Sequence, residues 1–324
     1  SVQQRGRAPG GRAVALSSVP RVAILPSATD DIARAVVEGG SSVVDVRDAD
    51  ALVWTDPRNP QGLKEVLETS EVDWVQLPFA GIETFFEAGV IDPSLTWTCA
   101  KGIYGPACAE HALALMLAAA RRLHVHARVA SWSKLGLDSP EYRLEGKTVV
   151  VVGTGGIGSA LVPMVRPLGL RIIAVNRSGR KLEGAERTVA VDELSGVLPE
   201  ADFVIVGAAY TEATHHLFDE SKLAAMGSDA WIVNVARGGL IDTDALVAAL
   251  RAQDIGGAAL DVTDPEPLPD AHPLWGLENC LITPHVANTW AMGLAELPGL
   301  VRRNVAARAA GKPMEGLVDP QVGY

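Results

Sequence analysis

Cysteines are scarce in this chain, and their spacing fits no disulfide scaffold. The 324 residues include only Cys99, Cys108 and Cys280, an odd number with no Cys-x-x-Cys among them. This pattern argues against a disulfide framework and is typical of the reducing cytoplasm, where we expect the protein. Aromatic residues are also few, at 5%, whereas there are 32 glycines. Such a composition fits α/β layers that pack tightly on small residues.

The chain also lacks an excess of positive charge and any apolar run suited to a membrane. It has 28 lysines and arginines against 39 aspartates and glutamates, a net charge of −11. Nucleic acids and anionic membranes attract basic patches, so we expect neither as a partner. The uncharged run 148–165 contains four glycines, and residues 1–18 lack the apolar core of a secretory signal. We therefore expect no transmembrane span, and a disordered leader over residues 1–18.

A glycine-rich turn directly follows an apolar strand pattern. Residues Val149–Val152 predict a strand buried on both faces, and Gly-x-Gly-x-x-Gly follows at residues 153–158 without a spacer. The first glycine permits a tight turn, the second lets a pyrophosphate approach the backbone, and the third lets the next helix pack on the strand. That helix presents its N-terminal amides to the phosphates. The motif therefore predicts a Rossmann-type dinucleotide site.

The residue expected to contact the cofactor ribose is neutral. Asn176 follows the predicted strand 171–175, at the position where NAD-specific sites place an acid. Arg177 and Ser178 come next, followed by Arg180 and Lys181, so a 2′-phosphate would meet donors and positive charge. We therefore expect NADP(H) to be preferred, with NAD(H) as the second candidate. The alternative is an exposed basic turn with no cofactor role.

Apolar runs alternate with helical patterns along the whole chain, which predicts parallel sheets covered by helices. The expected strands are residues 21–25, 43–46, 52–54, 74–77, 149–152, 171–175, 203–206, 231–234, 257–261 and 280–283. The expected helices are residues 30–38, 63–68, 109–123, 159–168, 219–226, 242–253 and 294–310. We predict an α/β protein of two doubly wound parallel-sheet domains, a Rossmann cofactor domain and a flavodoxin-like substrate domain, with a cleft between them. The substrate domain comprises residues 1–106 and 291–324, because the last segment has no strand pattern of its own, and the cofactor domain comprises residues 107–290.

Four polar residues follow strands of the second domain, where ligands bind in open α/β sheets. Arg237, Asp261 and His285 each come at or just after a predicted strand, and Glu266 lies in a proline-rich turn. An arginine can bind a carboxylate through two parallel hydrogen bonds. A histidine exchanges protons near neutral pH, and a carboxylate partner raises its pKa. Taken singly, each residue is more often a solvated or structural side chain.

These features resemble the D-isomer-specific 2-hydroxyacid dehydrogenases. The resemblance rests on segments in the family's order and spacing: Leu77–Glu83, Ala109–Leu115, Gly153–Gly158, Asn234–Gly238, Leu260–Val262 with Glu266-Pro267, and Thr283–His285. The chain departs from the family's pattern at Ala208-Ala209-Tyr210-Thr211, where a proline-containing loop is usual, and at Ala287, where a glycine is frequent.

The resemblance implies a role for each matching residue. Arg237 binds the substrate carboxylate, His285 donates the proton to the 2-oxo group, and Glu266 keeps His285 protonated. The implied cofactor-binding residues are Gly153, Gly155, Gly156, Ile157, Gly158, Asn176, Arg177, Ser178, Ala208, Val235, Ala236, Arg237, Asp261, His285 and Ala287. The implied substrate-binding residues are Ala80, Gly81, Ile82, Arg237 and His285.

The expected activity is hydride transfer between NAD(P)H and a small 2-oxo acid, of the glyoxylate or hydroxypyruvate kind. The alternative is a dinucleotide-sensing, corepressor-like binding protein on the same fold. We expect a homodimer built through the helix 109–123, because its apolar content exceeds what one sheet face covers. His215 and His216 lack a third ligand at a suitable spacing, so no metal is expected. His111 is expected to serve domain packing, Cys108 to be an inert thiol, and Trp290 to line the substrate pocket or an interface.

Overall fold

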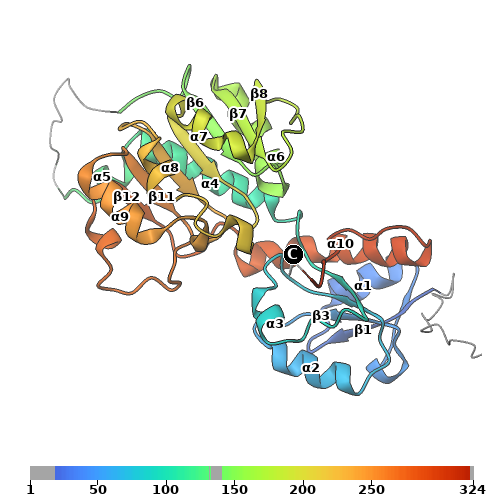
Figure 1. The fold of residues 1–324 in the computed structure, drawn as a ribbon. Coiled ribbons are helices and arrows are strands. Elements are labelled where there is room, and N and C mark those ends of the chain that lie inside the picture. Colours follow the sequence, from blue (N-terminus) through green and yellow to red (C-terminus); the bar gives the residue numbers. More distant parts are fainter. Residues whose placement is uncertain (1–18, 131, 133–140, 322–324) are drawn as a thin grey trace, which may run out of the picture.

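The computed structural model describes residues 19–130, 132 and 141–321. The expected leader, residues 1–18, lies outside the described residues. Two parallel sheets, one of five strands and one of seven, form separate lobes (Figure 1). The predicted α/β fold with two parallel-sheet domains is confirmed. None of the helices described is both long and apolar enough to cross a bilayer.

The smaller sheet has the strand order β2-β1-β3-β4-β5. All its pairings are parallel. This is the flavodoxin-like strand order, in which the order of successive strands reverses between β1 and β3. Its strands are β1 (Arg21–Leu25), β2 (Ser42–Val43), β3 (Ala51–Trp54), β4 (Trp74–Gln76) and β5 (Thr96–Thr98).

Helices cover both faces of the smaller sheet. One face packs on α1 (Asp30–Glu38) and on α10 (Trp290–Ala309), which contributes Leu297, Val301 and Val305. The other face packs on α2 (Pro60–Glu68) and α3 (Glu83–Glu87). Figure 1 shows the long helix α10 running along the smaller lobe beside α1. The last helix of the chain therefore returns to the first sheet.

The larger sheet has the order β12-β11-β10-β9-β6-β7-β8, again with parallel pairing throughout. Its strands are β6 (Thr148–Val152), β7 (Arg171–Asn176), β8 (Arg187–Ala190), β9 (Phe203–Val206), β10 (Trp231–Asn234), β11 (Gly257–Leu260) and β12 (Cys280–Ile282). The strand order reverses between β6 and β9, the point at which Rossmann folds bind dinucleotides. The glycine loop follows β6 and therefore lies at this point.

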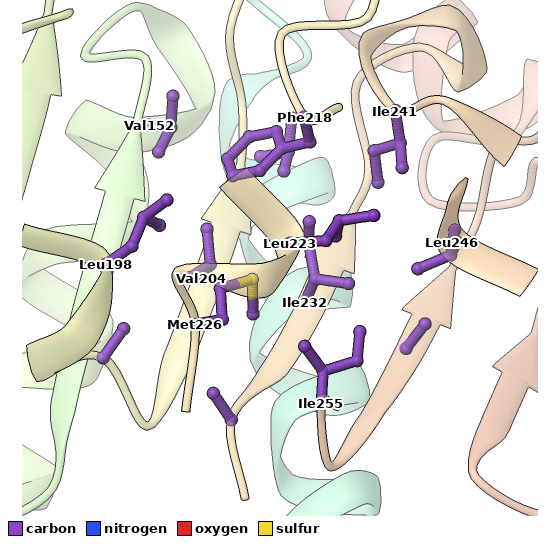
Figure 2. Packing of buried hydrophobic residues seen from close by; sticks show 14 of the residues in the cluster. Val152, Leu198, Val204, Phe218, Leu223, Met226, Ile232, Ile241, Leu246 and Ile255 are labelled. Atoms are coloured by element: carbon purple, nitrogen blue, oxygen red, sulfur yellow. The ribbon is translucent and has the colours of Figure 1, made fainter. Parts of the chain in front are cut away.

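Alternate residues of β6 point to opposite faces of the larger sheet. Val149 and Val151 join a core with α4 (Gly105–Ala120) and α6 (Gly156–Val165). Val150 and Val152 join the core on the other face. In Figure 2, Val152 and neighbouring strand residues lie beside Leu198 and Leu223 in that core. The remaining helices of this domain are α5 (Leu123–His126), α7 (Leu194–Val197), α8 (Glu220–Ala224) and α9 (Thr243–Ala252).

Several element boundaries differ from those expected. The helix expected over 109–123 begins at Gly105, because Pro106 is well placed in a first turn, and it ends at Ala120. The helix expected from residue 294 begins at Trp290, because the Thr289 side chain accepts a hydrogen bond from the backbone of Met292. The strands β5 and β8 and the short helix α3 were not expected.

Candidate active site

The glycine loop leaves no room for side chains at its first and third glycines. Gly153 has φ +97°, and a Cβ there would lie 2.5 Å from the backbone nitrogen of Ala208. A Cβ on Gly158 would lie 2.0 Å from the carbonyl oxygen of Gly153. At Gly155, in contrast, a Cβ would meet no atom of the described residues within 4 Å. The loop therefore packs tightly on neighbouring backbone at Gly153 and Gly158, and has space for a ligand at Gly155.

The start of α6 has free amides next to that opening. Gly155 is the N-cap residue, and no side chain caps the helix. The first amides of a helix lack partners within it and are a site for anions. The loop and the start of the helix therefore fit the pyrophosphate of a dinucleotide.

The segment that crosses from the smaller domain packs on the same loop. A Cβ on Gly105 would lie 2.4 Å from the carbonyl oxygen of Gly156. A Cβ on Gly156 would lie 3.1 Å from the Cα of Gly102. Backbone thus contacts backbone where the two domains join.

The side chain of Asn176 shapes the turn that follows β7. Its Oδ1 accepts hydrogen bonds from the backbone amides of Ser178 and Arg180, each at 3.1 Å. Its Nδ2 donates to the carbonyl oxygen of Arg180 at 2.7 Å and to the hydroxyl of Thr154 in the glycine loop at 3.2 Å. The side chains of Arg177 and Ser178 are exposed beside it. The turn therefore presents basic groups next to the glycine loop.

Arg237 follows β10 and contacts the other domain. Its Nε donates to Glu83 Oε1 at 2.9 Å, and its Nη1 donates to the carbonyl oxygen of Ala236 at 2.7 Å. Val235 and Ala236 are buried beneath it. The contact with Glu83 was not predicted from the sequence, because the two residues are 154 positions apart.

Glu266 and His285 form a hydrogen-bonded pair. Glu266 Oε1 lies 2.5 Å from His285 Nδ1, and both side chains are partly exposed. This hydrogen bond raises the pKa of His285 against the opposing effect of burial, and it lowers the pKa of Glu266. The positive charge of Arg237 acts on both groups and lowers both pKa values to a smaller extent. The structure therefore brings these three predicted residues together.

Asp261 is buried and supports the backbone around His285. Its Oδ1 accepts from the Thr283 hydroxyl at 2.6 Å and the Val286 amide at 2.9 Å, and its Oδ2 accepts from the Ala287 amide at 2.9 Å. Burial opposes ionisation of Asp261, but these bonds and one from His111 outweigh it and lower its pKa to about 2.

His111 belongs to the same network. Its Nε2 lies 3.0 Å from the Thr283 hydroxyl and 3.3 Å from Asp261 Oδ1. His111 thus connects α4 to the strand ends that carry the site. His285 itself has φ +53°, and its amide donates to the carbonyl oxygen of Asp261 at 2.8 Å.

The turn after β4 lies against Arg237. A Cβ on Gly81 would lie 2.3 Å from Arg237 Nη2, so a side chain there would displace the guanidinium from its present position. Within the described part of the chain, the backbone amides of Ala80, Gly81 and Ile82 donate to no protein acceptor. These amides are therefore available to an anionic ligand beside the guanidinium.

The remaining residues singled out from the sequence have ordinary partners. His215 stacks on His216 at 3.8 Å between ring centroids and bonds to the hydroxyl of Tyr210 at 3.0 Å. Trp290 packs edge-to-face on Phe79, with 5.1 Å between centroids. Burial raises the pKa of Cys108 to about 11, so its thiol is protonated at neutral pH.

The site combines a phosphate-binding glycine loop, the guanidinium of Arg237, and the imidazole of His285 hydrogen-bonded to the carboxylate of Glu266. A guanidinium and free amides can bind a carboxylate. A histidine with a raised pKa can donate a proton at neutral pH. Together, next to a bound dinucleotide, these groups suit reduction of a carbonyl that neighbours a carboxylate.

Comparison with known proteins agrees with this chemistry. Residues 113–287 match the family model of the D-isomer specific 2-hydroxyacid dehydrogenase NAD binding domain. An uncharacterised protein encoded in the proB 3′ region of Corynebacterium melassecola is 40% identical over 302 residues, which are 90% of this chain and 95% of that protein. The glyoxylate reductase of Thermofilum pendens is 34% identical over 234 residues, 69% of this chain and 68% of the relative.

A solved structure shares the whole architecture. The D-isomer specific 2-hydroxyacid dehydrogenase of Xanthobacter autotrophicus, determined with NADPH and MES, superposes with a TM-score of 0.79 at 25% identity. The match covers 95% of this chain and all of that one. The family match spans more than half of the chain and coincides with the glycine loop and the polar strand ends. The chain therefore belongs to the D-isomer specific 2-hydroxyacid dehydrogenase family.

Proposed function

We propose that this dehydrogenase reduces small 2-oxo acids of the glyoxylate and hydroxypyruvate kind, with NADPH as the preferred cofactor. The pairing of His285 with Glu266 beside Arg237 carries the proposal. These residues supply an acid of raised pKa and a carboxylate-binding cation at the end of a dinucleotide-binding sheet. Relatives named as glyoxylate reductases support the choice of substrate class.

The residues have separate tasks in this mechanism. Arg237 binds the substrate carboxylate, aided by the amides of Ala80, Gly81 and Ile82. His285 donates its proton to the oxygen of the 2-oxo group, and Glu266 stabilises the protonated imidazole. The bound nicotinamide supplies the hydride. In the reverse direction His285 accepts the proton.

The cofactor is held by the larger domain in this proposal. Gly153, Gly155 and Gly158 let the pyrophosphate approach the start of α6, where Gly156 and Ile157 offer amides. The residues proposed to contact the rest of the cofactor are Asn176, Arg177, Ser178, Ala208, Val235, Ala236, Arg237, Asp261, His285 and Ala287. The carboxylate of Asp261 is buried among four donors. Asp261 would therefore contribute to cofactor binding indirectly, by holding the backbone of Val286 and Ala287.

The alternative of a dinucleotide-sensing binding protein is not favoured, because the named relatives are reductases. A spectrophotometric screen distinguishes the two. Purified protein is mixed with NADPH and glyoxylate, hydroxypyruvate, pyruvate or a bulkier 2-oxo acid, and absorbance at the reduced-cofactor band is followed. The proposal expects the fastest turnover with glyoxylate or hydroxypyruvate. Cofactor binding without oxidation by any of these acids would contradict it.

The basic turn after β7 supports the choice of NADPH. Asn176 carries no charge to repel a 2′-phosphate, and Arg177 is exposed next to it. We expect kcat/KM to be higher with NADPH than with NADH for one 2-oxo acid. The Arg177→Ala variant should lose far more efficiency with NADPH than with NADH, whereas Arg47→Ala in the smaller domain should change neither. Equal or better use of NADH by the wild type would contradict the assignment.

We also propose the domain division, the assembly and the location expected from the sequence. Residues 1–106 and 291–324 form the substrate domain and residues 107–290 the cofactor domain, which the packing of α10 on the smaller sheet supports. A homodimer is supported by exposed apolar side chains on and after α4, namely Leu117, Leu123, Val129 and Trp132. A cytoplasmic location is supported by three free thiols.

A further inference from the structure

The ion pair between Glu83 and Arg237 joins the two domains at the proposed substrate site. Glu83 is the first residue of α3 in the smaller domain, and Arg237 follows β10 in the larger one. Their side chains meet at 2.9 Å and are partly exposed, 43% for Glu83 and 35% for Arg237. Glu83 ends the family segment Leu77–Glu83, but no role and no contact with Arg237 is predicted for it from the sequence.

Two acceptors on different domains fix the plane of the guanidinium. Nε donates to Glu83, and Nη1 donates to the carbonyl of Ala236. Arginine has five N–H donors, so three remain for a ligand after these two bonds. Nη2, which carries two of them, lies over Gly81 together with Glu83 Oε2, next to the free amides of that turn. The remaining donors therefore face the place proposed for the substrate carboxylate.

We propose that Glu83 is a positioning residue, which holds Arg237 in the orientation that receives the substrate carboxylate. This inference rests on the carboxylate-binding role proposed for Arg237. A long, partly exposed side chain without Glu83 would sample several rotamers, and binding would have to select one of them. Glu83 acts in this way through its acceptor atom. The negative charge of Glu83 adds little to substrate binding. It attracts the guanidinium, but it also repels the anionic substrate that the guanidinium is to bind.

The acceptor and the charge can be separated by substitution. Glu83→Gln keeps an oxygen that accepts from Nε and removes the charge. Glu83→Ala removes both, and Glu83→Asp keeps the charge at the start of α3 but shortens the side chain by one methylene. Glu87→Ala is the matched control, because Glu87 is exposed at the other end of the same helix.

The experiment measures KM and kcat for glyoxylate with saturating NADPH, together with binding of oxamate, a carboxylate that is not reduced. We expect Glu83→Ala to raise both the KM and the oxamate dissociation constant about tenfold, the upper range for ordering one long side chain. Its kcat should fall less than threefold, and the KM for NADPH should not change. Glu83→Gln and Glu87→Ala should remain within about twofold of wild type, and Glu83→Asp should resemble Glu83→Ala.

Several results would overturn the role of Glu83. An unchanged KM in both Glu83→Ala and Glu83→Asp would show that Arg237 needs no anchor. A lower KM would show that Glu83 competes with the substrate. A reduced kcat with unchanged KM would indicate a structural role only. Should Glu83→Ala not fold, Glu83→Asp and Glu83→Gln still decide between these outcomes. A wild-type protein that neither reduces glyoxylate nor binds oxamate would instead contradict the proposed function, and this inference with it.

Discussion

His285 combines an unusual backbone conformation with a side chain that depends on one partner. Its φ of +53° is held by bonds to the carbonyl oxygens of Asp261 and Thr283. Its imidazole bonds to Glu266. The backbone support and the protonation partner thus come from different residues, which lets each be tested separately.

Loss of the imidazole should abolish most of the activity. We predict that His285→Ala lowers kcat for 2-oxo acid reduction by about two to four orders of magnitude, the usual contribution of a general acid. Cofactor affinity, measured by fluorescence titration with NADPH, should fall far less than kcat, because His285 is only one of many residues proposed to contact the cofactor. His126→Ala is a suitable control, because His126 pairs with Glu141 away from the site. Turnover close to wild type in His285→Ala would exclude His285 as the acid.

Removal of the Glu266 charge should move the pH dependence of reduction. Reduction requires protonated His285, so the rate falls as the pH rises through the pKa of His285. Because Glu266 raises that pKa, Glu266→Gln should shift this falling limb toward lower pH. The rate of the reverse reaction, which needs neutral His285, should extend to lower pH in the same variant. An unchanged kcat/KM profile against pH would show that another group titrates.

The sequence predicts the residues proposed for the site but not the residues that support them. Arg237 and His285 follow strand ends and Glu266 lies in the turn after β11, all within family motifs, which is a local signal. Glu83 and His111 act through residues 154 and 172 positions away, and no local pattern encodes such a contact. His111 was expected to serve domain packing, and its bonds to Thr283 and Asp261 became visible only in the folded chain.

At the level of secondary-structure elements, different glycines of the glycine loop serve packing and ligand binding: Gly158 packs on backbone, and Gly155 leaves space for the cofactor. We predict that Gly155→Ala leaves stability unchanged, because its Cβ would meet no atom of the described part of the chain within 4 Å. The same change should weaken NADPH binding about tenfold by blocking the pyrophosphate. Gly158→Ala should destabilise the protein by about 1–3 kcal/mol, because its Cβ would collide with the Gly153 carbonyl. Urea denaturation and NADPH titration measure the two effects.

The control is Gly196→Ala, since that glycine also has open space around it but lies in α7. It should change neither stability nor binding. If Gly155→Ala binds NADPH as tightly as wild type, the pyrophosphate does not pass over this residue.

Long apolar strands were predictable and short edge elements were not. Val149–Val152 has no polar residue and lies in the middle of its sheet, where burial on both faces dictates the pattern. β8 is an edge strand with the sequence Arg-Thr-Val-Ala, half exposed, and so lacks that pattern. β5 has three residues and gains its place from pairing with β4. Such elements depend on tertiary contacts that the sequence does not display.

For the whole molecule, the absence of a strand pattern after residue 290 predicts that the last helix packs on the first domain, and α10 contacts the smaller sheet. The side chain of Asn304 in α10 strengthens this contact, because it is fully buried and donates to Gln76 of β4 at 2.8 Å. The carbonyl and amide of Glu315 bond to the same asparagine. The C-terminal helix is thus fixed to the first sheet by polar as well as apolar contacts.

We predict a dimer at micromolar concentration. The apolar side chains of Leu117 in α4 and Leu123 in α5 are 37% and 53% exposed, and burying them against a second copy would remove this surface from water. Light scattering after gel filtration should give twice the mass of one chain. The double variant Leu117→Glu/Leu123→Glu should be monomeric, whereas Val37→Glu, at an equally exposed site on α1, should not. A monomeric wild type would contradict the proposed assembly.

The contact of Gly102 and Gly105 with the glycine loop affects how the two domains can be recombined. Domain boundaries usually fall in segments that make few contacts and tolerate replacement. Here the crossing segment touches the backbone of Gly156, so any side chain at Gly105 would push on the phosphate loop. A chimaera that takes its substrate domain from a relative should therefore keep residues 102–105 with their own glycine loop. A junction before residue 102 preserves the contact between residues 102–105 and the glycine loop. A junction after residue 105 would instead pack the crossing segment of one protein against the glycine loop of another.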